Sequence, residues 1–286
     1  MTPAFVLMYH RICQRNRESA PWFARGTAVS PDAFARQVEW LVTRFDVRDV
    51  PGVLDSPSRP TVAITFDDGY ADVLHHALPV CEKFGIVGTT FVSSGPLRTG
   101  LPLWFDAFYA AAAAPEANAE GWFARHGHSR PRTPVEWANG PAKSWLGGRG
   151  HERAALVAEL AQLCPERIVS YMSVADLRQI LMRGWTIGGH GAEHHRLTEL
   201  DDFHIARELE ESAALLDSVG ARPRVFAYPD GANDERVAGF VKRAGFEIAC
   251  TVQPGSVEPG ADRFQVPRLF ARGEDHVPHP MLRAWC

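Results

Sequence analysis

The chain has 286 residues, a length that fits two domains or one α/β barrel, and 45% of its residues are hydrophobic while 22% are charged, as in ordinary soluble globular proteins. The formal net charge of −4 gives no sign of a nucleic-acid groove held by bulk positive charge, and a local basic patch is left open. Five scattered cysteines without a CxxC pair indicate buried or free thiols in a reducing compartment.

The start of the chain and its apolar runs bear on location. The opening "MTPAFVLMYHRI" has no basic region and only a short apolar run, so we do not expect a signal peptide. No uninterrupted apolar stretch approaches the roughly 18–20 residues that span a bilayer. We therefore expect a cytoplasmic, soluble protein of unknown oligomeric state, and we leave a peripheral membrane contact open.

Apolar runs that alternate with amphipathic segments predict strands and helices in turn. In chain order they are strand 4–9, helix 30–45, strand 61–66, helix 71–85, strand 86–93, helix 173–184, strand 185–190, helix 201–219, strand 224–229, helix 233–245 and strand 246–252. Residues 96–172 break this pattern with many aromatics and an alanine run, so we expect a partly helical insertion there.

Local signals support the helix assignments. Ser30 is followed by Pro31, and Ser173 is followed three residues later by Asp176, so both serines are expected as N-caps. Pro79 is expected to kink helix 71–85.

The alternation of strands and helices predicts βαβ units around a parallel sheet. The strands are almost continuously apolar, as in a sheet covered on both faces. About six or seven units favour a barrel or a distorted barrel over a small open sheet. We therefore expect an α/β fold in which residues 1–286 form a single barrel domain that contains the insertion 96–172.

Polar residues gather where several predicted strands end. "TFDDG", "IGGHGAEHH" and "FAYPDG" each follow an apolar run, and "LMYHR" ends in His10. Because the working residues of parallel α/β folds sit at the carboxyl ends of strands, one barrel mouth would gather all four segments.

The adjacent carboxylates of Asp67 and Asp68 allow two interpretations. Neighbouring side chains on a strand point to opposite faces, so both can enter one site only if the chain turns, which Gly69 favours. Alternatively, Asp68 caps the helix that begins near Ala71.

The histidines of "HGAEH" are four residues apart. On a helical turn that spacing places His190 and His194 on one face, where a divalent metal needs them. Two surface histidines in a polar loop are the alternative. "FAYPDG", with Tyr228 and Asp230, fits either a plain turn or a site.

Together these segments resemble the polysaccharide deacetylases of the NodB-homology type, carbohydrate esterase family 4. The family motif TFDDG is present at 65–69, and H-[S/T]-x-x-H is present at 190–194 with Gly191 in the second position. "MYHRI", "FAYPDG" and "VPRLF" are similar to the bacterial glycan-biosynthesis branch. The resemblance covers about residues 3–95 and 172–270, and implies a distorted (β/α) barrel of about seven units.

The resemblance also implies roles for single residues. Asp67 would be the general base, and Asp68, His190 and His194 the metal ligands. The family arginine that braces the base is replaced by Ala227, so Arg268 is a candidate substitute. The late leucine-histidine motif that supplies the general acid is not recognisable; the candidates for that acid are His10, which we favour, His276 and His279.

The implied activity is removal of an N-acetyl group from a sugar residue of a bacterial surface glycan or its precursor. Two imidazoles and a carboxylate suit Zn²⁺, while Co²⁺, Ni²⁺ and Fe²⁺ fit the same ligands. The predicted partner is an acetylated carbohydrate and not a nucleic acid. Residues predicted to contact it are Trp104, Tyr228, Asp230 and Arg268.

Two other functions are considered. "HGAEH" also matches the H-x-x-E-H pattern of zinc peptidases, with Glu193 as the base between His190 and His194, but the glycines of this segment disfavour the long helix that such enzymes use. A non-catalytic glycan-binding barrel is the other alternative, supported by the missing motif arginine and histidine.

Overall fold

The computed structural model describes residues 2–55, 59–114, 116–164, 169–222, 224–273 and 275–285. Within them lies a parallel sheet of eight strands in the order β10-β1-β5-β6-β7-β8-β9, with β4 paired to the first half of β5. The strands are β1 (Ala4–Tyr9), β4 (Asp46–Arg48), β5 (Thr61–Phe66), β6 (Thr89–Val92), β7 (Thr186–Gly189), β8 (Val225–Ala227), β9 (Ile248–Cys250) and β10 (Leu269–Phe270). A separate parallel pair is formed by β2 (Arg11–Ile12) and β3 (Ala28–Val29).

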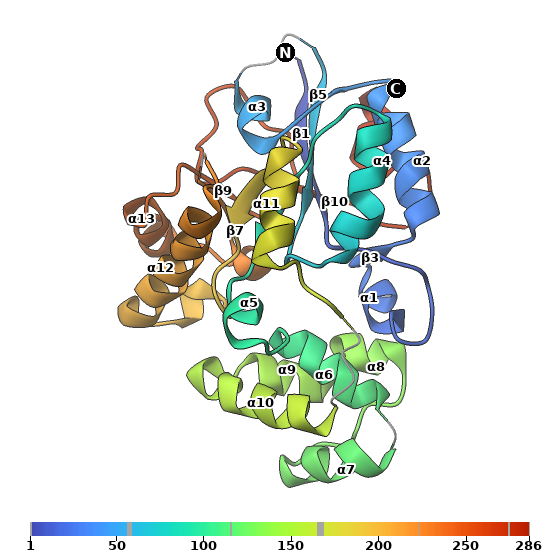
Figure 1. The fold of residues 1–286 in the computed structure, drawn as a ribbon, viewed down its shortest axis with the longest axis vertical. Helices are drawn as coiled ribbons and strands as arrows, with labels where there is room; N and C mark the ends of the chain where they lie inside the picture. Colours follow the sequence, from blue (N-terminus) through green and yellow to red (C-terminus); the bar gives the residue numbers. More distant parts are fainter. Residues whose placement is uncertain are drawn as a thin grey trace.

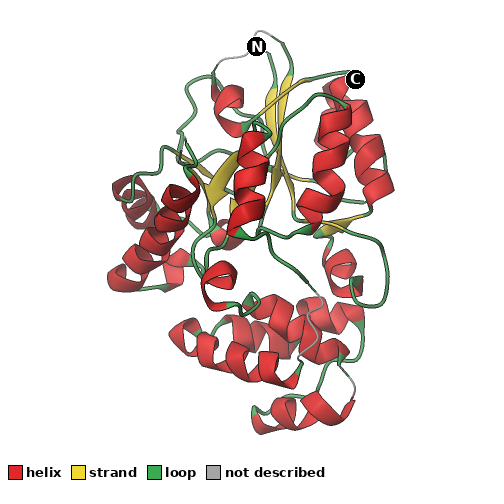
Figure 2. Ribbon diagram, in the orientation of Figure 1, coloured by secondary structure: helices red, strands yellow, loops and turns green. Residues whose placement is uncertain are grey.

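Helices surround this sheet, and a further group of helices lies beyond one end of it (Figure 1). Around the sheet are α2 (Pro31–Val42), α3 (Val50–Leu54), α4 (Leu78–Lys83), α11 (Val174–Met182), α12 (Asp202–Val219) and α13 (Glu235–Arg243). At the carboxyl ends of the strands are α1 (Ala20–Arg25), α5 (Gly95–Thr99), α6 (Trp104–Ala113), α7 (Glu116–Arg125), α8 (Pro134–Asn139), α9 (Pro141–Gly147) and α10 (Arg153–Leu163). Figure 2 shows that this second group contains helices but no strand in the part of the chain that is described.

The segment from Arg263 to Phe270 joins the two edges of the sheet. Its first half hydrogen-bonds to β9, because the N–H of Val266 donates to the carbonyl of Ala249 at 3.0 Å. Its second half is β10, which pairs in parallel with β1. The sheet is thereby curled around into a distorted (β/α) barrel, which confirms the predicted fold class.

Alternate residues of each strand face two different cores. Inside the barrel pack small and branched side chains, including Ala4, Val6, Ala63, Val225, Ala227 and Ile248. Their neighbours in sequence face outward and pack against the surrounding helices, as Phe5, Leu7, Val62, Ile64 and Phe226 do. This period of two extends past the strand ends and decides which polar side chains enter the barrel mouth.

The helices of the insertion have their own apolar core. Phe108, Trp122, Phe123 and Leu160 are buried in it, and Trp22 of α1 belongs to the same cluster. Residues 96–172 are more helical than predicted, since α5 to α10 fill most of the described part. The division into a single barrel domain with an insertion stays a prediction.

The local helix signals agree with the structure. The Ser30 side chain accepts a hydrogen bond from the N–H of Ala33, and Ser173 forms a reciprocal capping box with Asp176. The expected kink at Pro79 takes the form of a π-helical turn, Val73–Ala77, that runs into α4. The short strands β2, β3, β4 and β10 were not predicted, because two or three residues carry too little periodicity.

None of the helices in the described ranges is long and apolar enough to cross a membrane.

Candidate active site

The inward-facing positions of four strands end in polar side chains at the barrel mouth. In β1 the inward residues Ala4 and Val6 are followed at the same spacing by His10, and in β5 Ala63 is followed by Asp67. The same spacing puts His190 on the inner side of the barrel after β7. It also puts Arg268 on the inner side, two residues before the inward-facing Phe270 of β10. All four side chains line one cavity of about 870 Å³.

Asp68 enters the mouth because the backbone turns there. It has φ 74°, a left-handed conformation that ordinary residues seldom adopt, and Gly69 follows with φ 77°. A side chain at Gly69 would lie 2.9 Å from a methyl carbon of Val92, so only glycine fits. The turn brings both carboxylates to His190, whose Nε2 lies 3.5 Å from Asp68 Oδ1 and 4.0 Å from Asp67 Oδ2.

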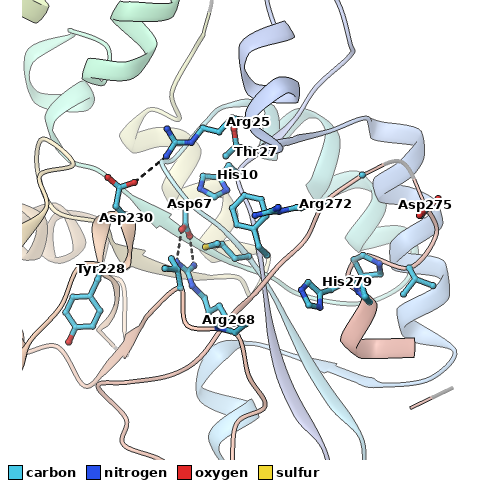
Figure 3. Close-up of a pocket in the computed structure, with 18 of the residues that line it drawn as sticks. His10, Arg25, Thr27, Asp67, Tyr228, Asp230, Arg268, Arg272, Asp275 and His279 are labelled. Atoms are coloured by element: carbon cyan, nitrogen blue, oxygen red, sulfur yellow. Dashed lines mark hydrogen bonds and ion pairs between the residues drawn. The ribbon is translucent and has the colours of Figure 1, made fainter. Parts of the chain in front are cut away.

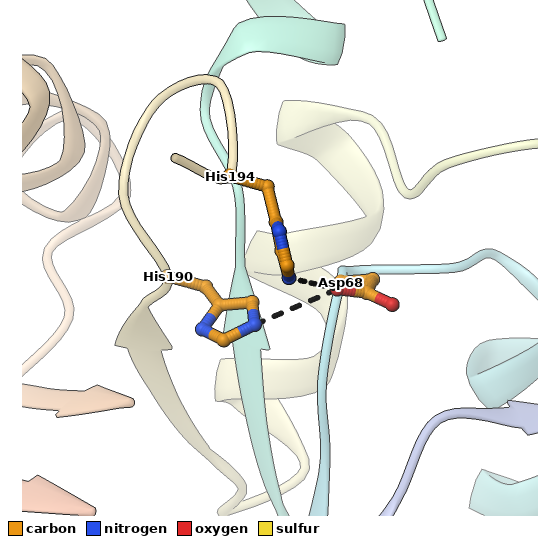
Figure 4. Close-up of side chains that lie close together, drawn as sticks. All are labelled: Asp68, His190 and His194. Atoms are coloured by element: carbon orange, nitrogen blue, oxygen red, sulfur yellow. Dashed lines mark ion pairs between the residues drawn. The ribbon is translucent and has the colours of Figure 1, made fainter. Parts of the chain in front are cut away.

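Asp68, His190 and His194 form a cluster that fits a metal ion (Figure 4). One ligand atom from each lies within 4.8 Å of the others, and all three side chains are buried. Asp68 Oδ1 and His194 Nδ1 have no hydrogen-bond partner, although such buried polar atoms normally have one. His190 Nδ1 lies 2.7 Å from the carbonyl oxygen of Ala227, which fixes the ring with Nε2 toward the cluster.

The prediction that the two histidines share a helical turn is wrong. Residues 190–196 form a loop after β7, and His194 has φ 53°, a left-handed conformation that turns its side chain back toward His190. The two imidazole rings still meet, with centroids 4.8 Å apart. The glycines of the segment explain the loop, because glycine disfavours helix and Gly191 itself has φ 71°.

The electrostatics of the cluster suit a cation. Burial lowers the pKa of His194 to about 3, with His190 adding to the effect, and burial also lowers the pKa of His190. Both imidazoles are therefore neutral at pH 7, the form that binds metals. Burial, together with the charge of Asp67, raises the pKa of Asp68, an effect that a bound cation reverses.

Asp67 pairs with Arg268 inside the barrel, and Figure 3 shows the two side chains facing each other. The guanidinium donates to Oδ1 at 2.6 Å and to Oδ2 at 2.8 Å. Burial opposes the charged form of Asp67, but Arg268 outweighs it and lowers the pKa to about 2. Arg268 therefore braces Asp67 in place of the family arginine, whose position in this chain is occupied by the uncharged Ala227. Its side chain is wholly buried although it lines the cavity, and its role as a substrate contact stays a prediction.

Two side chains outside the predicted set hold the loop of His194. Glu208 of α12 accepts hydrogen bonds from the N–H of Ala192 at 2.8 Å and of Glu193 at 3.2 Å. Arg153 of α10 donates to the carbonyl oxygens of Glu193 and His194, each at 3.2 Å. Neither residue belongs to a sequence motif, and Arg153 connects the insertion directly to the metal-ligand loop.

Glu208→Ala is expected to weaken metal binding about 10- to 100-fold, the usual cost of losing a group that orients a ligand. The loop N–H groups of Ala192 and Glu193 would lose their acceptor, so His194 would no longer be held toward Asp68. The measurement is a metal titration of the chelated protein. Glu211→Ala, one turn further along the same helix and paired with Arg98, is the matched control and should bind metal normally. Equal metal affinity in both variants would show that Glu208 does not orient the loop.

His10 lies at the barrel mouth, as predicted. Of the other two candidates for the general acid, His279 lines the cavity and His276 does not. His10 is close to Phe270, with ring centroids 5.4 Å apart, and its Nδ1 is buried without a partner. Burial lowers its pKa to about 4, so it is neutral at pH 7. His279 lines the outer part of the cavity, and His276 is exposed and does not line it.

Tyr228 lines the main cavity, as its prediction as a substrate contact requires. Tyr228 follows Phe226 on the outward face of β8, and its ring points away from Asp67 in Figure 3. Its hydroxyl donates to the carbonyl oxygen of Phe264 at 3.2 Å. This hydrogen bond anchors the end of β8, and the role of Tyr228 as a substrate contact stays a prediction.

Asp230 and Trp104, both predicted substrate contacts, line two smaller cavities together. Asp230 lines the cavity and pairs with Arg25 at 3.5 Å and Arg196 at 3.1 Å. Trp104 is buried in the insertion, with the cations of Arg153 and Lys143 over its ring at 5.1 and 5.7 Å. The roles of Trp104 and Asp230 as substrate contacts stay predictions.

Glu193 lies outside the metal-ligand cluster. Its carboxylate pairs with Arg98 at 2.7 Å on the partly exposed side of the loop. A zinc peptidase of the H-x-x-E-H type needs this carboxylate beside the two histidines on a helix. The peptidase alternative is therefore not supported by the geometry.

Comparisons with known proteins agree with one another. The sequence model of a family described as polysaccharide deacetylase matches residues 55–249, more than half of the chain. The protein YxkH of Bacillus subtilis (strain 168), named as a candidate polysaccharide deacetylase, is 18% identical over 272 residues, which cover 92% of this chain and 70% of YxkH.

Two solved structures share the fold across the whole chain. The deacetylase PplD of Streptococcus pyogenes, solved in complex with acetate, has a TM-score of 0.67 at 16% identity and covers 100% of both chains. A de-N-acetylase from Aggregatibacter actinomycetemcomitans has a TM-score of 0.64 at 16% identity and covers 99% of both chains.

Proposed function

The chain belongs to the polysaccharide deacetylase family, and we propose that it is a metal-dependent hydrolase that removes an N-acetyl group from a sugar residue of a bacterial surface glycan or its precursor. Carbohydrate deacetylase activity follows from the family. The observation that carries the finer proposal is the placement of Asp67 beside the cluster of Asp68, His190 and His194 in one cavity.

In this proposal Asp68, His190 and His194 hold a divalent metal, most favourably Zn²⁺, with Co²⁺, Ni²⁺ and Fe²⁺ suiting the same donors. When bound, such a metal acts as a Lewis acid that polarises the acetyl carbonyl and increases the acidity of a coordinated water. The neutral histidines and the fixed ring of His190 are the support for this assignment.

Asp67 acts as the general base. Its carboxylate remains ionised because Arg268 lowers its pKa to about 2 against the effect of burial, and it lies 4.0 Å from the Nε2 of His190. A base held in this way accepts a proton from the attacking water without moving. His10 is the proposed acid for the departing amine. Since it is neutral at pH 7, it can donate only after taking up a proton. In this proposal that proton is the one Asp67 has accepted from the attacking water, and the charge of Asp67 favours protonated His10.

The alternative of a non-catalytic glycan-binding barrel rested on the missing late histidine motif and on a missing brace for the base. Arg268 provides that brace from a different strand, with two hydrogen bonds to the Asp67 carboxylate. This arrangement favours a hydrolase over a binding protein.

Acetate release in a substrate panel tests the proposal. Chelated protein, reloaded with Zn²⁺, Co²⁺, Ni²⁺ or Fe²⁺, is incubated with N-acetylglucosamine oligosaccharides and with an O-acetylated sugar. We expect acetate and free amine in equal amounts from the N-acetylated substrates, and only with metal. Glu193→Gln, which leaves the cluster intact, should behave like the unaltered chain.

The other outcomes contradict the proposal in different ways. Acetate from the O-acetylated sugar alone would identify an esterase. Saturable oligosaccharide binding without acetate release under any metal would favour the glycan-binding barrel.

A further inference from the structure

Three hydrogen-bond donors of the insertion lie close together near the proposed active site. The Trp104 indole N–H is buried without a hydrogen-bond partner, and the buried Tyr109 hydroxyl has no acceptor for its own proton beside the guanidinium of Arg25. The Lys143 ammonium is buried with 4% of the residue exposed, and it donates to the carbonyl oxygen of Ala138 at 3.1 Å. It also lies 5.1 Å from the ring centre of Tyr109 and 5.7 Å from that of Trp104.

The charge of the buried Lys143 amine is only partly offset by the more distant carboxylates of Asp230 and Asp106. No carboxylate among the described residues forms an ion pair with its ammonium, whereas buried charges are normally paired. Burial, with Arg25 adding its charge, lowers the pKa of Lys143 to about 7. Burial raises the pKa of Tyr109, so its hydroxyl stays protonated and can donate.

These donors border cavities that open beside the metal-ligand cluster. A cavity of about 450 Å³ is lined by the cationic Arg25, Lys143, Arg153 and Arg196 and by the acidic Glu199 and Asp230. Both carboxylates are already paired with arginines, Asp230 with Arg25 and Arg196, and Glu199 with Arg196. The wall that Lys143 occupies therefore has a surplus of positive charge.

Residues that line more than one cavity show where this positive charge lies relative to the proposed active site. Arg25 and Asp230 line both the 450 Å³ cavity and the main cavity, and Figure 3 shows the two side chains paired at its edge. A small recess of about 40 Å³ is lined by Trp104, Tyr109 and Arg25 together with Asp68 and His194. The cavity of Lys143 is thus linked to the proposed site of hydrolysis through Trp104, Arg25 and Asp230, which line both the 450 Å³ cavity and the recess beside Asp68 and His194.

We propose that Lys143, with Tyr109, Trp104 and Arg25, binds an anionic substituent of the carbohydrate substrate, adjacent to the N-acetyl group that is removed. The proposal rests on the proposed function for the identity of the ligand as a sugar. The shared chemistry is a group with several acceptor oxygens and negative charge, which describes both the carboxylate of a uronic acid and the phosphate of a sugar phosphate. An ammonium, a hydroxyl and an indole N–H together donate hydrogen bonds to the acceptor oxygens of such a group, and the ammonium neutralises its charge.

Direct binding to the unaltered chain tests the site without any turnover. The probes are glucuronate, glucose 1-phosphate and, as a neutral match, methyl glucoside, measured by calorimetry. We expect the better anionic probe to bind about 10- to 100-fold more tightly than methyl glucoside, as expected for hydrogen bonds to a charged group. Which of the two anions binds more tightly distinguishes a carboxylate from a phosphate source.

Two variants test whether Lys143 causes the preference for the anionic probe over methyl glucoside. Lys143→Met should remove the preference for the anionic probe and leave methyl glucoside binding unchanged. Lys83→Met, an exposed lysine of α4, should keep the preference. An equal ratio of anionic to neutral binding in Lys143→Met and the unaltered chain would overturn the proposal, as would the absence of any anionic preference in the unaltered chain.

Amine labelling keeps the test decisive if Lys143→Met does not fold. The chain has three lysines, Lys83, Lys143 and Lys242, so mass spectrometry can follow each one separately after reductive methylation. The anionic probe should slow labelling of Lys143 alone, and methyl glucoside should not. Equal protection by both probes, or by acetate as strongly as by the sugar anion, would contradict the proposal. Failure of deacetylation in the substrate panel leaves these binding results unaffected, so the two proposals fail separately.

Discussion

Asp67→Asn is expected to lower kcat for deacetylation about 10²- to 10⁴-fold, the usual contribution of a general base. The amide cannot accept the proton from the attacking water, while Asp68, His190 and His194 are unchanged and should bind one metal ion as before. Acetate release and metal content, measured on the same sample, separate these two effects. Because Arg268 outweighs burial and lowers the pKa of Asp67 to about 2, the loss should be the same across about pH 5–8.

This variant needs a control for stability, since it leaves the wholly buried Arg268 without its counter-charge. Breaking a buried ion pair costs about 3–5 kcal/mol of folding free energy. The double variant Asp67→Asn/Arg268→Met removes both charges and should recover much of that stability while remaining inactive. Normal turnover by a folded Asp67→Asn protein would show that another group is the base.

The same pair predicts how stability depends on pH. The folded-state pKa of Asp67 lies below its ordinary value, so the ion pair stabilises the fold above about pH 4. This contribution is lost as the pH falls toward the folded-state pKa of about 2, where Asp67 takes up a proton. Arg268→Met should abolish that part of the acid sensitivity in unfolding experiments.

His190→Ala is expected to reduce metal affinity at least about 100-fold and to abolish acetate release at ordinary metal concentrations. Loss of a group that merely orients a ligand costs about 10- to 100-fold, so loss of the ligand itself should exceed that range. Removing the imidazole also breaks the contact that fixes the ring against Ala227. Metal content after dialysis and activity at increasing Zn²⁺ are the measurements.

His75→Ala, at an exposed position of the π-helical turn, is the matched control and should keep full metal content. A dialysed His190→Ala protein that retained stoichiometric metal and normal activity would place the metal elsewhere. In that case the cluster of Asp68, His190 and His194 would need another explanation.

Much of the fold could be predicted because its strands are buried on both faces and read as short apolar runs between capped helices. The four side chains Asp67, Asp68, His190 and His194 were identified from two motifs that follow such runs. Their roles stay predictions, but the structure brings them together. The helical placement of His190 and His194 failed because the glycines around them permit left-handed backbone conformations.

The period of two along a strand explains both the position of Tyr228 and the importance of Arg268. Counting from the inward Ala227 puts Tyr228 on the outer face, and counting back from Phe270 puts Arg268 inside. This information was present in the sequence, but β10 has only two residues and was not recognised as a strand. The supports Glu208 and Arg153 lie on helices far along the chain, and only the folded arrangement brings them to the loop of His194.

The closing segment of the barrel has a consequence for synthesis of the protein on the ribosome. Asp67 emerges first and receives its counter-charge from Arg268, 201 residues later in the chain. At about 5–20 residues per second, this interval lasts roughly 10–40 s. Throughout that time the barrel of the nascent chain is open and the Asp67 carboxylate lacks its counter-charge. In the proposed function, the chain therefore gains the capacity for hydrolysis only when the last strand, β10, docks.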